Sequence, residues 1–308
     1  MEEGNAAYGE KQRNKFRSHP KIVASKFGEV STEEIDRAVT VMKECYDRLA
    51  PHEVSLVDLY IFERSSSTKA FLAKECEEVG VISASFDELF FAMHDAWRGT
   101  PRIVLCLDRM RKLPRLVQTG GIRHEVGHSV LHGSLIYYLL PLPRVLLDLS
   151  KRFNLPLEYA TNLLYLISIA VKDYEVSRLL YECGYVEDQI AYAKHVLTVS
   201  DSDVLSWRIS RGKPLAEALC LISCLKAASC AVPLLCDKKF DTMIRKRVEK
   251  SLSHLPPRYS TLLSKTVLEG FSSMGEDTLN NIDQMTRLIV KKIVEPILSE
   301  NSVNYNTR

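Results

Sequence analysis

The residues best suited to chemistry in this chain are His124 and His128, which stand four positions apart in the segment His124-Glu125-Val126-Gly127-His128. On an α-helix, four residues turn through about 400°, so both imidazoles leave the same face about one turn apart. Two neutral imidazoles placed in this way can bind one Zn²⁺ ion. Glu125 is rotated by about 100° from His124, which puts its carboxylate within reach of a metal-bound water. One helical turn therefore offers two metal ligands and a general base.

A wider segment around the motif, TGGIRHEVGHSVLHG, resembles the active-site helix of the zincin metallopeptidases. The stretch before it is similar to their upper subdomain, and the resemblance covers about residues 54–183. The metzincin extension HExxHxxGxxH is absent, because Leu131 and Ser134 stand where that pattern has Gly and His. The chain thus looks more like a gluzincin, which implies that the third zinc ligand is an acid on a later helix. The NExxSD pattern of the thermolysin-like members is also absent.

Two acids on a predicted helix over 157–183 are candidates for the third ligand. Asp173 has apolar or small residues three and four positions away on either side, so its carboxylate is expected in the core, where it must be paired or bind a metal. Glu175 has half-polar surroundings, but it has the longer side chain and matches the residue type that the resemblance implies. The two acids point about 200° apart and cannot both face one ion. We predict Glu175 as the ligand and keep Asp173 as a nearly equal alternative; an ordinary salt bridge is the other interpretation of either acid.

His132 extends the histidine series but lies eight residues, or about 12 Å, along the helix from His124. The three imidazoles therefore cannot all bind one ion. We expect His132 to support a ligand by hydrogen bonding or to pack in the core.

The resemblance implies a zinc-dependent hydrolysis of peptide bonds. Zinc would lower the pKa of its water toward about 7, and Glu125 would take the proton as the water attacks a carbonyl. A second hydrogen-bond donor to the oxyanion is usual in such sites. His94 and Trp97 could border the cleft, and an edge strand within about residues 81–97 would bind the substrate. The candidates for the second donor are Tyr137, Tyr138, Tyr165, Tyr174 and His195.

The elements around the motif predict an α+β fold with a small mixed sheet. Ser31 or Thr32 can cap a helix that runs to about residue 49. Residues 54–63 and 103–107 are rich in branched and aromatic side chains and predict buried strands. A helix is expected over 66–78 and a short strand over 81–85, while 86–97 fits either type. After residue 119 only helices are predicted, over about 121–140, 157–183, 187–199, 202–211, 214–231, 239–254, 257–271 and 276–299.

Three regions follow from this order of elements. We predict a polar N-terminal arm over 1–28, a zincin-like catalytic domain over 29–183 and an all-helical C-terminal part over 184–308. The helical part is expected to pack against the catalytic helices.

The composition excludes several classes of protein. With 308 residues, 46% of them hydrophobic and 26% charged, the chain matches ordinary globular proteins rather than disordered ones. A net charge of +2 gives no reason to expect a nucleic-acid partner. The longest apolar stretch, 218–236, carries Lys226 in its middle, so we expect a buried helix and no membrane span. A polar N-terminus without an apolar segment indicates a cytoplasmic protein, with its eight cysteines as reduced thiols.

The sequence as a whole therefore predicts an intracellular zinc metallopeptidase that acts on a peptide or protein substrate. The alternative from a different class is a non-enzymatic metal-binding or regulatory protein on a zincin-like scaffold. A helical regulatory protein without a metal is a third interpretation. An open coordination position on the metal would distinguish the enzyme from the scaffold protein.

Overall fold

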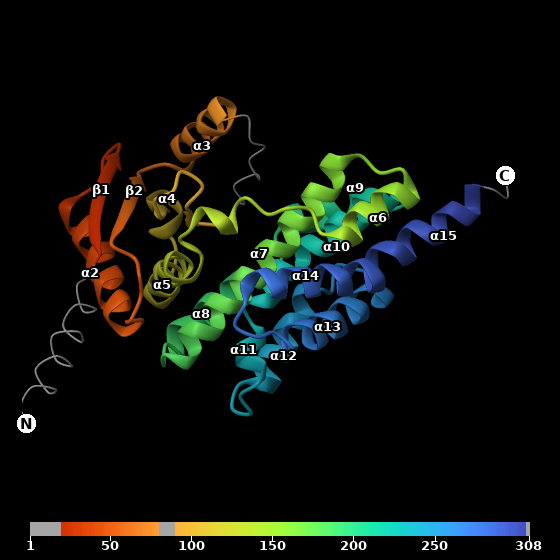
Figure 1. The fold of residues 1–308 in the computed structure, drawn as a ribbon. Coiled ribbons are helices and arrows are strands. Elements are labelled where there is room, and N and C mark those ends of the chain that lie inside the picture. Colours follow the sequence, from red (N-terminus) through yellow and green to blue (C-terminus); the bar gives the residue numbers. More distant parts are fainter. Residues whose placement is uncertain (1–19, 80–89, 306–308) are drawn as a thin grey trace, which may run out of the picture. The chain divides into compact units, whose positions relative to one another are not determined.

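The computed structural model describes residues 20–79 and 90–305 and shows an α+β protein, which confirms the predicted fold class (Figure 1). The contacts between residues divide the chain into two compact units. Unit 1 comprises the residues up to 139 together with 182–192, and unit 2 comprises 140–181 and the residues from 193 onward. The predicted boundary at residue 183 differs from this division, because the helix that carries Asp173 and Glu175 belongs to unit 2 up to Tyr181.

Unit 1 is built on a four-stranded mixed sheet in the order β1-β2-β4-β3. β2 pairs in parallel with both β1 and β4, and β3 pairs antiparallel with β4 at the edge. All five residues of β4 are buried, as a short apolar run predicts for a strand that is covered on both faces. The strands are β1 (Lys21–Phe27), β2 (Leu56–Phe62), β3 (Ala92–Asp95) and β4 (Arg102–Cys106). The predicted strands over 54–63 and 103–107 are confirmed, and the strand predicted over 81–85 lies outside the described residues.

The strand β1 corrects the prediction of a polar arm over 1–28. Lys21 to Phe27 pair in register with Leu56 to Phe62, and the rings of Phe27 and Phe62 stack with their centroids 4.3 Å apart. The lysines at both ends of this segment suggested a solvated arm. Lysine is also common on edge strands, where it discourages pairing with another chain. The rest of the predicted arm, residues 1–19, lies outside the described residues.

α2 and α3 begin and end close to their predicted positions, whereas α5 begins six residues and ends eight residues earlier than the predicted range of 121–140. α2 (Thr32–Arg48) starts with a capping box in which Ser31 and Glu34 each bond the other's backbone N–H. α5, which carries the histidine motif, packs against α2, β3 and β4. The remaining helical segments are α3 (Ser65–Val79), α4 (Leu107–Met110), α5 (Arg115–His132), a 3₁₀ turn over Leu135–Tyr137, and the first part of α8 (Glu187–Val196).

Two glycines let other elements approach α5 closely. A Cβ at Gly120 would lie 2.5 Å from the carbonyl oxygen of Asp188 in α8, and a Cβ at Gly121 would overlap the ring of Phe91. A side chain at either position would therefore collide with a neighbouring element. These contacts set α5 against its neighbours immediately before the motif.

A buried ion cluster holds the edge strand β3 in unit 1. Arg102 of β4 lies opposite Asp95 of β3 in the register, and its guanidinium is 2.8 Å from the Asp95 carboxylate. The same guanidinium is 2.7 Å from the Glu75 carboxylate of α3. Since all three side chains are at most 8% exposed, Arg102 compensates two buried negative charges at once.

Unit 2 is entirely helical in its described residues. α10 packs against α9, α13 and α15, and the apolar stretch 218–236 forms α10 and α11, so it is a buried helical segment as predicted. Among the described residues, no helix is both long and apolar enough to cross a membrane. The elements are α6 (Arg144–Phe153), α7 (Leu157–Glu182), the end of α8, α9 (Asp201–Ser210), α10 (Pro214–Ser229), α11 (Val232–Leu235), α12 (Asp241–Ser251), α13 (Pro257–Phe271), α14 (Thr278–Ile289), a π-helical turn over Val290–Val294, and α15 (Glu295–Tyr305).

The sequence analysis did not predict α6. Pro143 is the N-terminal cap of this helix, a position where a missing backbone N–H costs nothing. The proline therefore marks a helix start.

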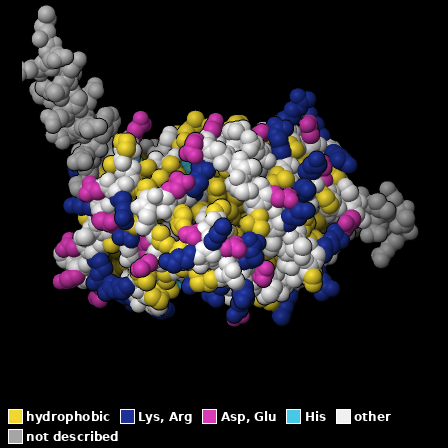
Figure 2. All heavy atoms as spheres, turned by 90° about the horizontal axis from the view of Figure 1, so that it is seen from below, with side chains coloured by type: hydrophobic (Ala, Val, Ile, Leu, Met, Phe, Trp, Pro, Cys, Tyr) yellow, Lys and Arg dark blue, Asp and Glu magenta, His cyan; other side chains and the backbone are white. Residues whose placement is uncertain are grey.

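Acidic and basic side chains are interspersed over the face of the protein shown in Figure 2. This agrees with 41 Lys and Arg residues against 39 Asp and Glu residues in the chain.

Candidate metal centre

The two histidines of the motif lie side by side on α5 in unit 1. Nε2 of His124 is 3.2 Å from Nε2 of His128, and the ring centroids are 4.8 Å apart. A tetrahedral ion with Zn–N bonds of about 2.0–2.1 Å separates two nitrogen ligands by about 3.3 Å. The helix thus presents both imidazoles at the spacing of two ligands of one ion. Hereafter these two side chains are called the imidazole pair.

His132 extends the series from the other side of His128. Nδ1 of His132 lies 3.3 Å from Nδ1 of His128, and the His132 side chain is fully buried. In such a contact one ring donates and the other accepts, so the tautomers of the two rings are linked. When His128 donates from Nδ1, the lone pair of its Nε2 is available to a metal. The arrangement fits the predicted supporting role of His132.

Two of the residues predicted to border the cleft or donate to the substrate lie near His128. The hydroxyl of Tyr138 is 3.0 Å from Nδ1 of His94, which β3 carries. The His94 ring is nearly parallel to the His128 ring, with centroids 6.0 Å apart. Tyr137 contacts His132 instead, at 5.3 Å between ring centroids. Unit 1 therefore gathers His94, Tyr138 and the imidazole pair at the edge of the sheet.

The other predicted residues lie elsewhere. Trp97 packs beside the guanidinium groups of Arg98 and Arg102 rather than beside the imidazole pair. Tyr165, Tyr174 and His195 belong to unit 2, where the Tyr174 ring packs against Phe271.

α5 is held in its rotational position by polar contacts on both sides of the motif. Arg123, next to His124, donates to Asp188 of α8 at 2.9 Å and to Glu44 of α2 at 2.7 Å. The hydroxyls of Ser129 and Tyr46 form a buried hydrogen bond of 2.5 Å. Burial raises the pKa of Tyr46 well above its ordinary value, so this phenol stays protonated. These contacts fix the direction in which the imidazole pair points.

Sequence reasoning missed Tyr192 of α8, whose ring centroid lies 5.0 Å from that of His124 and 6.5 Å from that of Phe91. The sequence signal that could have indicated such a neighbour is Gly120, because a glycine lets a side chain of another element pack directly against the helix. A Cβ at Gly120 would lie 2.9 Å from the Cβ of Tyr192.

Glu125 lies between the two histidines and is 3% exposed. Its position on α5, about 100° around the helix from His124, is the one predicted for a general base. Within the described residues of unit 1, no third His, Cys, Asp or Glu side chain completes a three-ligand group with the imidazole pair.

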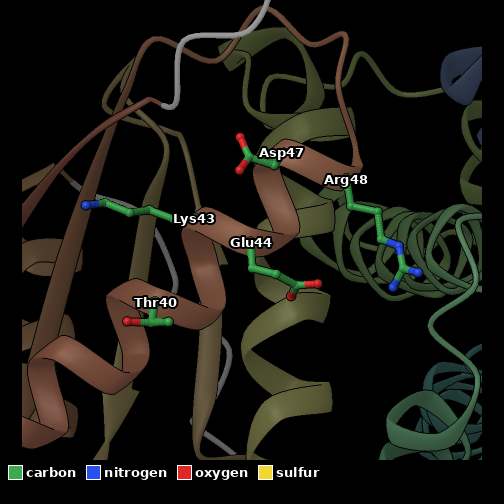
Figure 3. A pocket seen from close by; sticks show the side chains of 5 residues that line it. All are labelled: Thr40, Lys43, Glu44, Asp47 and Arg48. Atoms are coloured by element: carbon green, nitrogen blue, oxygen red, sulfur yellow. The ribbon is translucent and has the colours of Figure 1, made fainter.

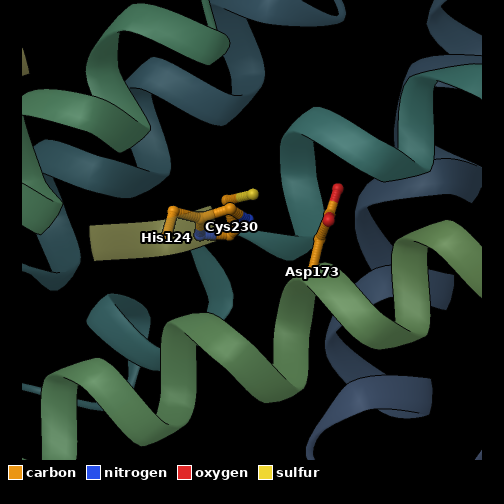
Figure 4. A group of neighbouring side chains, drawn as sticks. All are labelled: His124, Asp173 and Cys230. Atoms are coloured by element: carbon orange, nitrogen blue, oxygen red, sulfur yellow. The ribbon is translucent and has the colours of Figure 1, made fainter. Parts of the chain in front are cut away.

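The two candidate acids of α7 have different surroundings in unit 2. Both oxygens of Glu175 accept hydrogen bonds from α14, one from the Thr278 hydroxyl at 2.7 Å and one from the Asn281 amide at 2.6 Å. Asp173 is 6% exposed, and one of its carboxylate oxygens lies within 4.8 Å of Sγ of Cys230, the residue that follows α10. Figure 4 shows Asp173 rising from α7. These two bonds hold the Glu175 carboxylate against α14.

Lys172 shares this part of α7. Burial lowers the pKa of its amine to about 8, although the neighbouring Asp173 and Glu175 act in the opposite direction. The Lys172 amine therefore lies in a poorly solvated environment.

A surface hollow of about 530 Å³ lies along α2 of unit 1 (Figure 3). It is lined by Thr40, Lys43, Glu44, Asp47 and Arg48, none of which is a predicted site residue.

Comparison of the chain with family models, curated proteins and solved structures found no match. The likeness to zincins is therefore carried by the motif and its geometry alone.

Proposed function

We propose that this protein is a zinc-dependent peptide hydrolase with the imidazole pair as two of its metal ligands. The 3.2 Å distance between the two Nε2 atoms carries the proposal, because it is within about 0.1 Å of the separation that a tetrahedral zinc ion requires. His124 is 2% exposed, so an ion there would be shielded from bulk water on that side.

The sequence leaves Asp173 and Glu175 of α7 as alternatives for the third ligand. Glu175 already satisfies two donors of α14, and removing it from them would leave Thr278 and Asn281 as buried groups without their acceptor. Zinc titration of variants at the two positions decides between them.

Zinc at this position would lower the pKa of a water toward about 7 and polarise the carbonyl of the bond to be cleaved. Glu125 takes the proton as the water attacks and then delivers it to the leaving amine. Tyr138 is positioned by its bond to His94 to donate to the developing oxyanion, which is the role of the second donor.

The sheet offers a way to orient a peptide substrate. β3 is the outermost strand of the sheet formed by the described residues, and it carries His94. An extended peptide can add to an edge strand through main-chain hydrogen bonds, which fix its direction while leaving side-chain preference to neighbouring pockets. The ion cluster of Arg102, Asp95 and Glu75 keeps this strand in place.

The proposal is tested by metal content and hydrolysis measured on the same preparations. Full-length wild type should bind one zinc per chain and cleave a mixed peptide library. His124→Ala and His128→Ala should each lose the zinc, whereas His254→Ala, a histidine outside the motif, should keep it. Glu125→Gln should keep the zinc and lose about 10²–10⁴-fold in kcat, the contribution of a general base. Wild type that binds no zinc, or that loses it equally in the His254→Ala control, would refute the proposal.

The non-enzymatic alternative has one observation in its favour, the thiol of Cys230 beside the carboxylate of Asp173. A metal with four protein ligands is a structural site, whereas a hydrolase needs a position for water.

A further inference from the structure

The turn between α9 and α10 in unit 2 combines exposed apolar side chains with cations. The two helices pack against each other (Figure 1), and the turn Arg211-Gly212-Lys213 joins them. Leu205 and Ile209, which are one helical turn apart on α9, are 54% and 58% exposed, and Leu215 at the start of α10 is 38% exposed. Hereafter the α9–α10 tip means these three apolar side chains together with the cations Arg208, Arg211 and Lys213.

The charge of the α9–α10 tip is positive throughout. From 204 to 216 the sequence contains three cations and no acid, and all three cations are exposed. The acids of α9, Asp201 and Asp203, belong to its first turn, about 8–10 Å along the helix axis before Arg208. The tip therefore attracts anions, while its apolar side chains would be stabilised by leaving water.

The backbone at the tip has a defined conformation. Gly212 has a φ of +78°, in the left-handed region that glycine adopts without strain. Its N–H donates to the carboxylate of the buried Glu217 at 2.7 Å. A Cβ at Gly212 would lie in open space among the described residues, so the turn is not packed against another element. Because the backbone is already fixed, a partner that binds here has to order only side chains.

We propose that the α9–α10 tip docks on the surface of a lipid bilayer that contains anionic lipid. Such a surface offers both environments that the tip can use, anionic headgroups for the cations and an apolar acyl boundary for Leu205 and Ile209. An acidic protein surface would satisfy the cations but leave the exposed apolar side chains in water. The proposal does not depend on the metal centre of unit 1, so either can fail without the other.

The size of the expected effect follows from the composition of the tip. Each Lys or Arg near an anionic membrane surface contributes about five-fold in affinity. Loss of all three cations should therefore weaken binding about 10²-fold. Burial of a half-exposed leucine or isoleucine contributes a similar factor, so the loss of Leu205 and Ile209 together should weaken binding at least about ten-fold.

Co-sedimentation of the full-length protein with lipid vesicles tests the proposal. Wild type should bind vesicles of phosphatidylcholine with about one-third phosphatidylserine, and should bind vesicles of pure phosphatidylcholine at least about ten-fold more weakly. The triple variant Arg208→Gln/Arg211→Gln/Lys213→Gln should bind the anionic vesicles about 10²-fold more weakly than wild type. The double variant Leu205→Gln/Ile209→Gln should lose at least about ten-fold.

Two matched control variants change the same residue types elsewhere in unit 2. Lys239→Gln/Lys246→Gln/Lys250→Gln removes three exposed cations within and just before α12. Leu147→Gln/Leu279→Gln removes two exposed leucines, one in α6 and one in α14. Both controls should bind the anionic vesicles within about three-fold of wild type, because charges farther from the membrane than the screening length contribute little.

Equal losses in the tip variants and in their controls would overturn the proposal, because binding would then follow overall charge or hydrophobicity. Wild type that does not bind anionic vesicles would also overturn it, and capture of a polyglutamate peptide in that case would assign the tip to an acidic protein partner.

If a tip variant does not fold, as judged by circular dichroism, the salt dependence of wild type decides. About 1 M NaCl reduces the screening length to about 3 Å and should weaken binding to anionic vesicles at least about ten-fold relative to about 0.1 M. Binding that is insensitive to salt would contradict the role of the cations.

Discussion

The choice between Asp173 and Glu175 as third ligand leads to opposite predictions for stability and metal content. Glu175 accepts hydrogen bonds of 2.7 and 2.6 Å from two buried groups of α14. A hydrogen bond to a charged group contributes about 1.5–3 kcal/mol, and loss of the Glu175 carboxylate also relieves its own burial cost. We therefore expect Glu175→Ala to lower the free energy of unfolding of the metal-free chain by about 3 kcal/mol. Glu175→Gln, which retains one acceptor oxygen, should lose roughly half as much.

If Asp173 is the third ligand, its substitution should mainly lower zinc affinity, whereas substitution of Glu175 should mainly lower stability. Asp173→Asn keeps the shape of the side chain and removes a charge that is buried beside Cys230. The zinc affinity of this variant should fall by at least about ten-fold.

The assay is urea unfolding of the metal-free proteins followed by circular dichroism, together with zinc titration of each variant. Comparable slopes of the free energy of unfolding against urea would show that the same transition is compared. The reasoning is refuted if Glu175→Ala loses zinc at unchanged stability, or if Asp173→Asn retains the zinc affinity of wild type.

Three further predictions concern unit 1. Tyr138→Phe should lower kcat by about 10²–10³-fold with little change in KM, as expected for a lost oxyanion donor; steady-state kinetics on a cleaved peptide decide this, and a change confined to KM would assign Tyr138 to substrate binding. Arg102→Met should destabilise the protein by about 3–5 kcal/mol, because the buried Asp95 and Glu75 would be left with only the half-exposed Arg98 guanidinium nearby; urea unfolding of the variant measures this, and a loss below about 1 kcal/mol would contradict it. The bond of Glu34 to Arg111 lowers the pKa of Glu34 from 4.5 to about 2. A depressed carboxyl pKa stabilises the folded state above the unfolded pKa and loses this effect as the pH falls through the folded value. The difference in unfolding midpoint between wild type and Glu34→Gln should therefore be constant above about pH 5 and vanish toward pH 2, and a difference that grows on acidification would refute the assignment.

The histidine helix was predictable because its signals are local. The four-residue spacing of His124 and His128 determines their common face once a helix forms, and Ser31 with Glu34 determines where α2 begins. The strands β2 and β4 were predictable for a similar reason, since their branched and aromatic residues form continuous runs.

The features that were missed depend on partners far away in the sequence. β1 is a strand because its backbone pairs with β2, more than 30 residues later, and its lysines gave no sign of that pairing. Glu175 looked half-solvated on its own helix, yet its partners lie about 100 residues further on, in α14. A pattern of neighbours on one helix describes only the surface that the helix presents, and it does not identify what covers that surface.

Several residues in and around the motif destabilise α5, and this argues that the helix has a function beyond packing. Gly120 and Gly121 each weaken a helix interior by about 1 kcal/mol relative to alanine. His124, Glu125 and His132 are all at most 3% exposed, where apolar side chains would stabilise the fold without needing polar partners. A helix selected only for packing against α2, β3 and β4 would not combine these features. Local violations of good packing chemistry are typical of functional sites, where the remaining structure compensates for them. β4, which contacts α5 and buries Ile103, Val104 and Leu105, is an example of that compensation.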